Sequence, residues 1–190
     1  MKKRKIGVIV GSDSDLKQCV KGLEHLIEKY TYGKVELTWV DTASQHRNPL
    51  TVTGILSDYA SYPENDKVDV LIIGAGMANH LSCCSDAILR NILKDNHIVV
   101  IAVAFEDKAN PEHTKAAVYS IKYVPGTQAV FKDYIGAQGF WNACCDAFEM
   151  ELPEIKLRPV KPWIRRTFWD ALAEGKKLLE IDEQKKLTAT

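Results

Sequence analysis

Short apolar runs alternate with longer stretches of helical periodicity over the first 150 residues of the chain. The runs are nearly continuous and rich in β-branched residues, as is typical of parallel strands buried on both faces. They predict strands at Lys5–Val10, Val35–Val40, Val68–Ile73 and His97–Ala104, with a shorter one at Gln128–Phe131. Apolar residues three or four positions apart predict helices at Asp15–Tyr30, Pro49–Tyr62, Leu81–Lys94, Pro111–Ser120 and Ala137–Glu149.

This alternation predicts the α/β class. A strand followed by a helix, repeated along the chain, favours a parallel sheet with helices packed on both faces. We therefore expect a three-layer sandwich with a flavodoxin-like or Rossmann-like sheet over residues 1–152, forming the catalytic domain. The order of the strands across the sheet is left open by the sequence.

The composition changes after Leu152. Pro153, Pro159 and Pro162 exclude a regular helix in the segment that follows. A long amphipathic helix is predicted over Arg165–Leu187. We expect residues 153–190 to form a proline-rich arm and a C-terminal helix, packed either on the parent domain or on a neighbouring subunit.

The overall charge does not indicate a polyanionic partner. Lys and Arg total 25 and Asp and Glu total 25, so the net charge is zero and gives no global attraction to nucleic acid or to a membrane surface. No apolar run approaches the roughly 20 residues of a membrane-spanning helix. The basic start Met1–Lys5 precedes an apolar run of only about five residues, so it indicates the lead-in to a strand rather than a signal peptide.

The five cysteines form two adjacent pairs and one single residue, with no CxxC spacing. This pattern suits neither a secreted disulfide framework nor a tetrahedral zinc site. We expect reduced, mostly buried thiols in a cytoplasmic protein. His25, His97 and His113 lie far apart in the sequence and indicate no metal site.

Candidate chemistry is sought in the loops that follow the strands, because open α/β sheets bind ligands at the carboxyl ends of their strands. The first loop, Gly11–Asp15, places hydroxyl and carboxylate groups before a helix, where free N–H groups favour a phosphate. Ser and Asp at this position are also ordinary helix caps, so the loop has a purely structural alternative.

The second loop offers Ser44, His46 and Arg47. Histidine has an unperturbed pKa near 6.5 and can transfer protons in both directions at neutral pH, whereas arginine presents a planar fork to a phosphate or carboxylate. A histidine in a loop can equally be a solvated side chain without a function.

The third loop, Gly74–His80, begins like the dinucleotide fingerprint GxGxxG. Asn79 stands where the third glycine would be, and the loop follows the third strand rather than the first, so we reject NAD binding. Its small residues still allow a flat ligand to approach the backbone closely. The chain lacks GxxxxGK[ST], HExxH and GxSxG, and we expect no cofactor.

Taken together and in this order, the three loops resemble one family, the 5-(carboxyamino)imidazole ribonucleotide mutases and phosphoribosylaminoimidazole carboxylases of purine biosynthesis. The family's GSxSD is similar to Gly11–Asp15, its SAHR-x-P to Ser44–Pro49, and its GAGGAAHL to Gly74–Leu81. The resemblance covers about residues 5–150, with a weaker likeness at Val118–Ile121 and Val124–Thr127.

The resemblance implies a mutase, an isomerase that moves a carboxylate from nitrogen to carbon 4 of an imidazole ribonucleotide by decarboxylation and recarboxylation. His46 would be the proton shuttle. Ser12 and Arg47 would bind the phosphate, and Asp15 the ribose hydroxyls. The other positions matching the family's substrate-binding motifs are Ser44, Gly74, Ala75, Gly76, His80 and Leu81. The partners implied are the ribonucleotide, CO₂ and other copies of the chain in an octamer, with the C-terminal helix reaching over a neighbour.

The chain departs from the family pattern at several positions that we expect near the reaction centre: Gln45, Met77, Asn79, Ser82 and Cys83. The His46-Arg47 pair is common in mutases, whereas the carboxylases commonly have His-Lys. The alternatives are a lyase that carboxylates aminoimidazole ribonucleotide with CO₂ directly, a relative acting on another ribonucleotide, a non-catalytic ribonucleotide-binding paralogue, and a flavin-mononucleotide carrier.

Overall fold

The structure, a computed structural model, describes residues 3–61, 63 and 67–188. The chain divides into two compact units, Met1–Arg158 and Pro159–Thr190. The division follows Arg158 rather than Leu152 because the segment between them packs on the first unit. Ile155 is buried there, and Gln128 and Lys156 exchange two hydrogen bonds of 2.9 Å between side chain and backbone.

The first unit is built on a parallel sheet, which has four strands within the described residues. They are β1 (Arg4–Val10), β2 (Val35–Thr42), β3 (Val70–Ala75) and β4 (Val99–Ala104), in the order β2-β1-β3-β4. The chain therefore leaves β1 toward one edge of the sheet and returns to β3 on its other side. Such a reversal opens a crevice between the loops that follow the two central strands.

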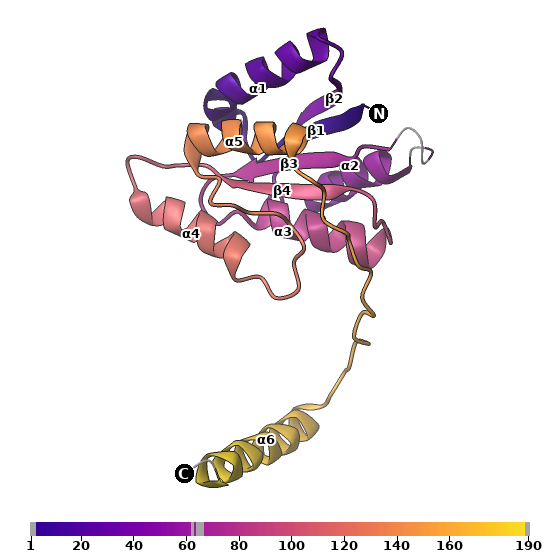
Figure 1. Cartoon of the computed structure of the whole chain (residues 1–190). Helices are drawn as coiled ribbons and strands as arrows, with labels where there is room; N and C mark the ends of the chain where they lie inside the picture. Colours follow the sequence, from indigo (N-terminus) through magenta and orange to yellow (C-terminus); the bar gives the residue numbers. More distant parts are fainter. Residues whose placement is uncertain (1–2, 62, 64–66, 189–190) are drawn as a thin grey trace. The chain divides into compact units, whose positions relative to one another are not determined.

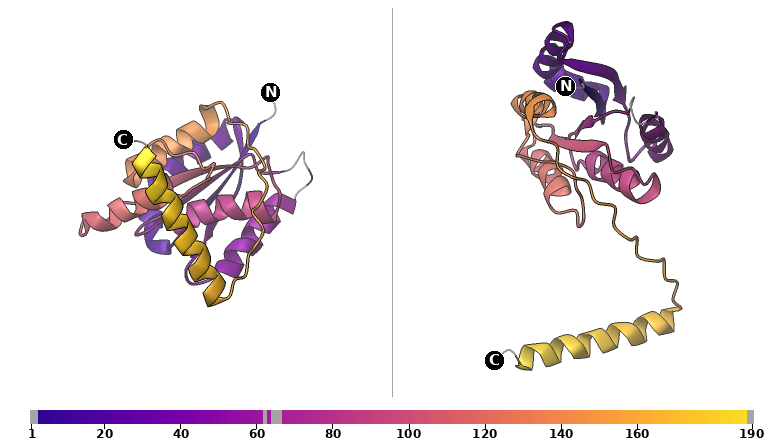
Figure 2. Two further views of the ribbon diagram at one scale, coloured as in Figure 1. Left: turned by 90° about the horizontal axis from the view of Figure 1, so that it is seen from below. Right: turned by 45° about the vertical axis from the view of Figure 1, so that its right-hand side comes forward.

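Helices cover both faces of the sheet, so the three-layer α/β prediction is confirmed (Figures 1 and 2). Helices α1 (Leu16–Thr31) and α5 (Gly136–Glu149) pack together on one face, over Ile6, Val8 and Val10. The opposite face carries α2 (Pro49–Ser61), α3 (His80–Ala87) and α4 (Pro111–Lys122). The period-two alternation of β1 thus divides its apolar side chains between two cores. Tyr62, the predicted end of the second helix, lies outside the described residues.

Two of the predicted elements are wrong in detail. Gln128–Phe131 is not a strand: Val130 forms a single parallel bridge with Ile101, and Ile135 another with Ala104, because the chain turns away between them at Asp133, whose φ is +54°. The helix predicted at Leu81–Lys94 changes at Ile88 into a π-helical turn, Ile88–Ile92. This turn brings the buried Arg90 against Asp86 and the carbonyls of Asp95 and Ile98.

The second unit contains helix α6 (Phe168–Thr188), which begins later than the predicted Arg165. Thr167 and Asp170 cap its first turn: the amide of Asp170 donates to Thr167 Oγ1 at 3.2 Å, and this hydroxyl donates to the Asp170 carboxylate at 2.7 Å. Large apolar side chains are exposed in this unit, among them Trp163, Phe168 and Trp169. Among the described residues, no helix is both long enough and apolar enough to span a membrane.

Candidate active site

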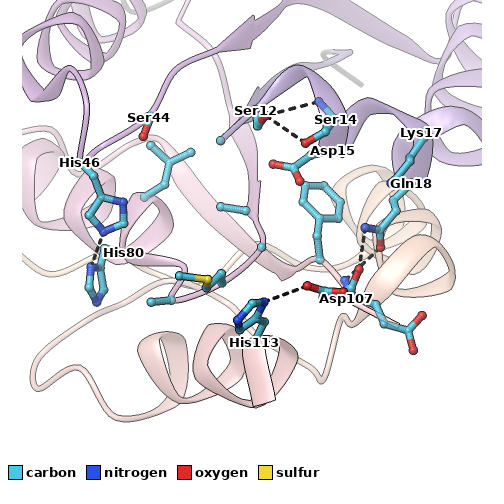
Figure 3. A pocket seen from close by; sticks show the side chains of 18 of the residues that line it. Ser12, Ser14, Asp15, Lys17, Gln18, Ser44, His46, His80, Asp107 and His113 are labelled. Carbon is cyan, nitrogen blue, oxygen red and sulfur yellow. Dashed lines mark hydrogen bonds and ion pairs between the residues drawn. The ribbon is translucent and has the colours of Figure 1, made fainter. Parts of the chain in front are cut away.

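A cavity of about 920 Å³ lies at the carboxyl ends of the strands (Figure 3). The loops after all four strands contribute to it, as the strand order leads one to expect. Of the ten predicted site residues, nine line this cavity: Ser12, Asp15, Ser44, His46, Arg47, Ala75, Gly76, His80 and Leu81. Segments that lie far apart in the sequence are therefore brought to one place.

Gly74 is the one predicted site residue that does not line the cavity. Its carbonyl accepts a 2.9 Å hydrogen bond from the amide of Gly11, which ties the first loop to the third. A Cβ at Gly74 would lie 2.6 Å from the Phe105 ring, and one at Gly11 would lie 2.8 Å from the Ala75 Cβ. Both glycines thus allow a close approach of neighbouring segments.

The first loop folds into a 3₁₀ turn at Asp13–Asp15, with Ser12 as its N-cap. Ser12 Oγ accepts a 3.4 Å hydrogen bond from the Ser14 amide and lies 3.0 Å from Ser14 Oγ. Asp15 is directed into the cavity, and burial raises its pKa, although the Ser12 backbone and the charges of Lys17 and Arg47 act in the opposite direction. The loop combines hydroxyls and a carboxylate at one wall (Figure 3).

Arg47 joins the second loop to the first. Its Nη2 donates to the Gly11 carbonyl at 3.3 Å, and its amide donates to Ser44 Oγ at 3.4 Å. The guanidinium is otherwise open to the cavity and remains exposed. A planar cation beside the hydroxyls of the first loop is an arrangement suited to a phosphate.

His46 and His80 lie in contact at one end of the cavity. His46 Nε2 lies 3.0 Å from His80 Nδ1, with the ring centroids 5.1 Å apart (Figure 3). One ring nitrogen must carry the proton of this hydrogen bond and the other must accept it. His80 is the first residue of α3, so the start of this helix fixes the position of its ring beside His46.

Asn79, Ser82 and Cys83 do not line the cavity, contrary to the expectation that these departures from the family pattern lie near the reaction centre. Asn79 is fully buried: its Nδ2 donates to the Val103 carbonyl at 2.7 Å, and its Oδ1 accepts from the amide and the hydroxyl of Ser82. Asn79 therefore caps α3 and connects it to β4, and the Ser82 hydroxyl connects the helix to the Ile73 carbonyl of β3 at 2.8 Å. Met77 and Gln45 do line the cavity, and Met77 is exposed.

The loop after β4 also lines the cavity, although none of its residues was among the predicted site residues. Glu106, Asp107, Lys108 and Ala109 line the cavity, together with His113 from α4. His113 donates to Asp107 at 2.8 Å, and this hydrogen bond, with those from nearby amides, lowers the pKa of the Asp107 carboxyl. The sequence contains a signal for this loop: three successive charged residues, Glu106, Asp107 and Lys108, follow the strand predicted at His97–Ala104, where a ligand loop is expected.

Comparison with known protein families decides where the chain belongs. The sequence profile of one family, described as AIR carboxylase, matches residues 5–151. The chain belongs to the AIR carboxylase family. The match covers the whole sheet and every loop that lines the cavity, and it stops before the second unit.

Two relatives are similar to this chain over most of its length. The N5-carboxyaminoimidazole ribonucleotide mutase of Thermotoga maritima is 30% identical over 181 residues, which cover 93% of each chain. The mutase of the same name from Pyrococcus abyssi is 31% identical over 158 residues, covering 80% of this chain and 78% of its own. The crystal structure of Treponema denticola PurE superposes with a TM-score of 0.51 at 16% identity, over 96% of this chain and 98% of that chain, and shows the same fold.

Metal and redox chemistry were not expected in this AIR carboxylase relative. Within residues 3–61, 63 and 67–188, no group of three or more His, Cys, Asp and Glu side chains is arranged to hold a metal ion. All five cysteines are free thiols. Burial raises the pKa of Cys83 and Cys84, and neither residue lines the cavity.

Proposed function

We propose that this protein is an N5-carboxyaminoimidazole ribonucleotide mutase. The observation that carries the proposal is the convergence of His46 with Ser12, Asp15 and Arg47 in one cavity of a chain that belongs to the AIR carboxylase family. The names of the two curated relatives support the mutase rather than another reaction on the same fold.

The substrate lies with its phosphate at Ser12 and Arg47 and its ribose hydroxyls at Asp15. Hydroxyls, an arginine fork and a helix start are all suited to a phosphate, and a carboxylate accepts hydrogen bonds from a diol. The imidazole then extends toward the third loop, where Ala75 and Gly76 present little side-chain bulk, with Ser44 and Leu81 beside them.

His46 moves one proton in each half of the reaction. The bond between the exocyclic nitrogen and the carboxylate breaks, CO₂ leaves, and His46 in its imidazolium form gives the Nε2 proton to that nitrogen and becomes neutral. Carbon 4 of the imidazole then attacks the CO₂, and the neutral His46 removes the proton from carbon 4. Holding the CO₂ beside carbon 4 makes the second half effectively intramolecular.

His80 orients the ring of His46. Its Nδ1 lies 3.0 Å from His46 Nε2, and the hydrogen bond between the two nitrogens fixes the direction in which the His46 ring points. The ribonucleotide must displace or share this hydrogen bond when it binds. His80 is therefore a positioning residue in this proposal, and His46 is the catalytic one.

The proposal includes assembly into a homo-octamer acting in the cytoplasm. The exposed aromatic side chains of the second unit, with Phe168 94% and Trp169 80% exposed, support its packing on another copy of the chain. Five free thiols support a reducing compartment. His46 and His80 are exposed in a single chain, whereas retention of CO₂ needs a closed cavity, so a neighbouring subunit or the ligand must cover it.

The decisive experiment gives the protein N5-carboxyaminoimidazole ribonucleotide and, separately, aminoimidazole ribonucleotide with bicarbonate, and follows formation of the carbon-4 carboxylate. Product from the first substrate alone is the expected result. The His46→Asn variant should lose nearly all turnover and keep its ligand affinity, because asparagine binds but transfers no proton at neutral pH. The matched control His25→Asn, at a half-buried histidine outside the cavity, should leave turnover unchanged.

Product from the second substrate alone would instead assign the direct carboxylase reaction. Binding without turnover of either substrate would assign a ribonucleotide-binding protein without this catalysis. A yellow protein as purified would indicate a flavin carrier.

A further inference from the structure

Gln45 is a departure from the family pattern that does line the cavity. The family's SAHR-x-P motif has alanine at this position. Its two neighbours in the chain, Ser44 and His46, lie at the same end of the cavity (Figure 3). A hydrogen bond of 2.9 Å from the Asn48 amide to the Ser44 carbonyl closes the turn that contains Gln45. A long polar side chain therefore stands beside the proposed catalytic histidine, where the family pattern has a methyl group.

The amide oxygen of Gln45 has no hydrogen-bond partner. Within the described residues, Oε1 is closed off from solvent and accepts no hydrogen bond, although the residue as a whole is half-buried. Ser85 Oγ is the one other buried side-chain atom in this state in that part of the chain, and Ser85 does not line the cavity. A buried carbonyl without a donor has lost its water and gained no bond, which destabilises the unliganded protein. Because alanine would avoid this cost, we look for a donor outside the chain.

The proposed ligand carries one N–H donor that the site has not yet satisfied. Its phosphate presents acceptors, and its ribose hydroxyls are assigned to Asp15. In the imidazole ring one nitrogen is bonded to the ribose and the other is an acceptor. The remaining donor is the exocyclic nitrogen on carbon 5. In the proposed function His46 gives one proton to this nitrogen, so its other N–H is free to donate to a second group.

The amide of Gln45 reaches the ligand by rotation about its last side-chain bond. Since Oε1 is covered, other atoms of this side chain line the cavity. The terminal torsion of a glutamine has a broad energy profile, so turning the amide toward the interior of the cavity costs little. Pairing Oε1 on binding then recovers the free energy that its burial costs in the unliganded chain. This hydrogen bond therefore contributes more to affinity than one formed by a solvated amide.

We propose that Gln45 is a specificity-determining residue, whose Oε1 accepts a hydrogen bond from the exocyclic N–H of the bound imidazole. This inference rests on the proposed function, which places the exocyclic nitrogen at His46. The hydrogen bond favours ribonucleotides with an N–H group on carbon 5 of the imidazole over those with only hydrogen there. It also fixes the rotation of this group about its bond to carbon 5, beside the His46 ring.

The test compares two ligands that differ only in the amino group: aminoimidazole ribonucleotide, and imidazole ribonucleotide with hydrogen on carbon 5. Calorimetric titration of the full-length native protein should give about tenfold tighter binding of the amino compound. The variant Gln45→Met keeps the length of the side chain and removes both polar atoms. In this variant the preference should fall to about twofold, while the affinity for imidazole ribonucleotide stays unchanged.

The stability of Gln45→Met separates recognition from a structural role. Methionine leaves no buried acceptor unpaired, so the unliganded variant should unfold at an equal or higher urea concentration than the native chain. The matched control is Gln138→Met. Gln138 is exposed on α5 outside the cavity, and its Nε2 donates to Asn142 Oδ1 at 3.1 Å. This control should keep the native affinities and the preference for the amino compound.

Three results overturn the assignment of Gln45. They are equal affinity of the native chain for both compounds, a preference that survives in Gln45→Met, and a lower urea midpoint of that variant, which would show that the amide is already paired in the unliganded protein. The titrations need no turnover, so absence of mutase activity with an intact preference counts against the proposed function alone. No binding of either compound would overturn both proposals.

Discussion

Arg47 is the residue whose replacement tests phosphate binding most directly. Its guanidinium is anchored by one bond to the Gly11 carbonyl and otherwise faces the cavity. Arg47→Ala should weaken ribonucleotide binding by about 1.5–3 kcal/mol, which is roughly 10- to 150-fold in Kd, because it removes a charge-assisted contact. Calorimetry with aminoimidazole ribonucleotide measures this loss.

The stability of the Arg47→Ala variant is measured as a control, to show that a loss of affinity does not come from unfolding. Arg47 is exposed, so its removal should change the free energy of unfolding by less than about 0.5 kcal/mol. An unchanged ribonucleotide affinity in a folded variant would remove Arg47 from the phosphate site. The variant Arg47→Lys, which keeps the charge and loses the planar fork, should show an intermediate affinity.

The pair of His46 and His80 shows how a residue acquires its role from its neighbour. Each histidine follows a different strand, and 34 residues of chain separate them. The sequence motif assigned His80 only to substrate binding. In the proposed function, the 3.0 Å contact between the two rings gives His80 the further task of orienting His46, and this contact requires the second and third loops to meet.

At the scale of elements, the start of α3 determines where His80 stands. Asn79 caps this helix from a fully buried position and also binds the Val103 carbonyl of β4. Asn79 and Ser82 therefore connect the end of the third loop to the sheet, through hydrogen bonds to the Val103 and Ile73 carbonyls. Their side chains form a satisfied polar network in the core rather than a contact surface for the ligand.

Asn79→Ala should destabilise the protein by about 2–4 kcal/mol, because it removes a helix cap and two buried hydrogen bonds, from Asn79 Nδ2 to the Val103 carbonyl and from the Ser82 amide to Asn79 Oδ1. Urea unfolding followed by circular dichroism measures the change. The exposed asparagine Asn48, whose Oδ1 accepts from the Thr51 amide at the start of α2, provides the matched control. Asn48→Ala should cost about 1 kcal/mol, and an equal cost for both variants would contradict the buried network.

The π-helical turn at Ile88–Ile92 is a second element that organises buried polar groups. Arg90, 4% exposed, binds Asp86 at 3.1 Å, while Asp86 also accepts from Thr127 and from the Gln128 amide. Burial lowers the pKa of Arg90, and the charges of Asp86 and Asp95 oppose this effect. The network holds the segment after α4 against α3.

At the scale of the whole molecule, the two units differ in how they bury apolar surface. The first unit encloses its own core on both faces of the sheet. In the second unit Trp163, Phe168 and Trp169 are 77%, 94% and 80% exposed. Apolar surface of this extent is typical of an interaction site.

Deletion of the residues from Pro162 onward should loosen the oligomer, because it removes most of this exposed apolar surface. Light scattering of the full-length and shortened chains measures the mass directly, and the shortened chain should give the lower value. Its circular dichroism per residue should retain the α/β signature, since the first unit has its own core. Equal masses for the two chains would refute a role of the second unit in assembly.

The alternation of apolar runs and helical periods predicted the parallel sheet, its four strands and five of the helices, because burial on both faces requires local patterns that are visible in the chain. Ser12, His46 and Arg47 were predicted for a similar reason: ligand loops follow strand ends, and the three motifs match one family in order. The loop after β4 was not singled out, because charged residues in a loop look like solvated surface until their neighbours are known.

The sequence by itself determined the fold class, the family and three of the loops that line the cavity, since each depends on residue types at short separations along the chain. Only the tertiary structure decided the strand order, the contact of His46 with His80 and the burial of Asn79. These depend on which segments meet after the chain has crossed the sheet. Such contacts join residues 24 to 64 positions apart, and no local pattern records them.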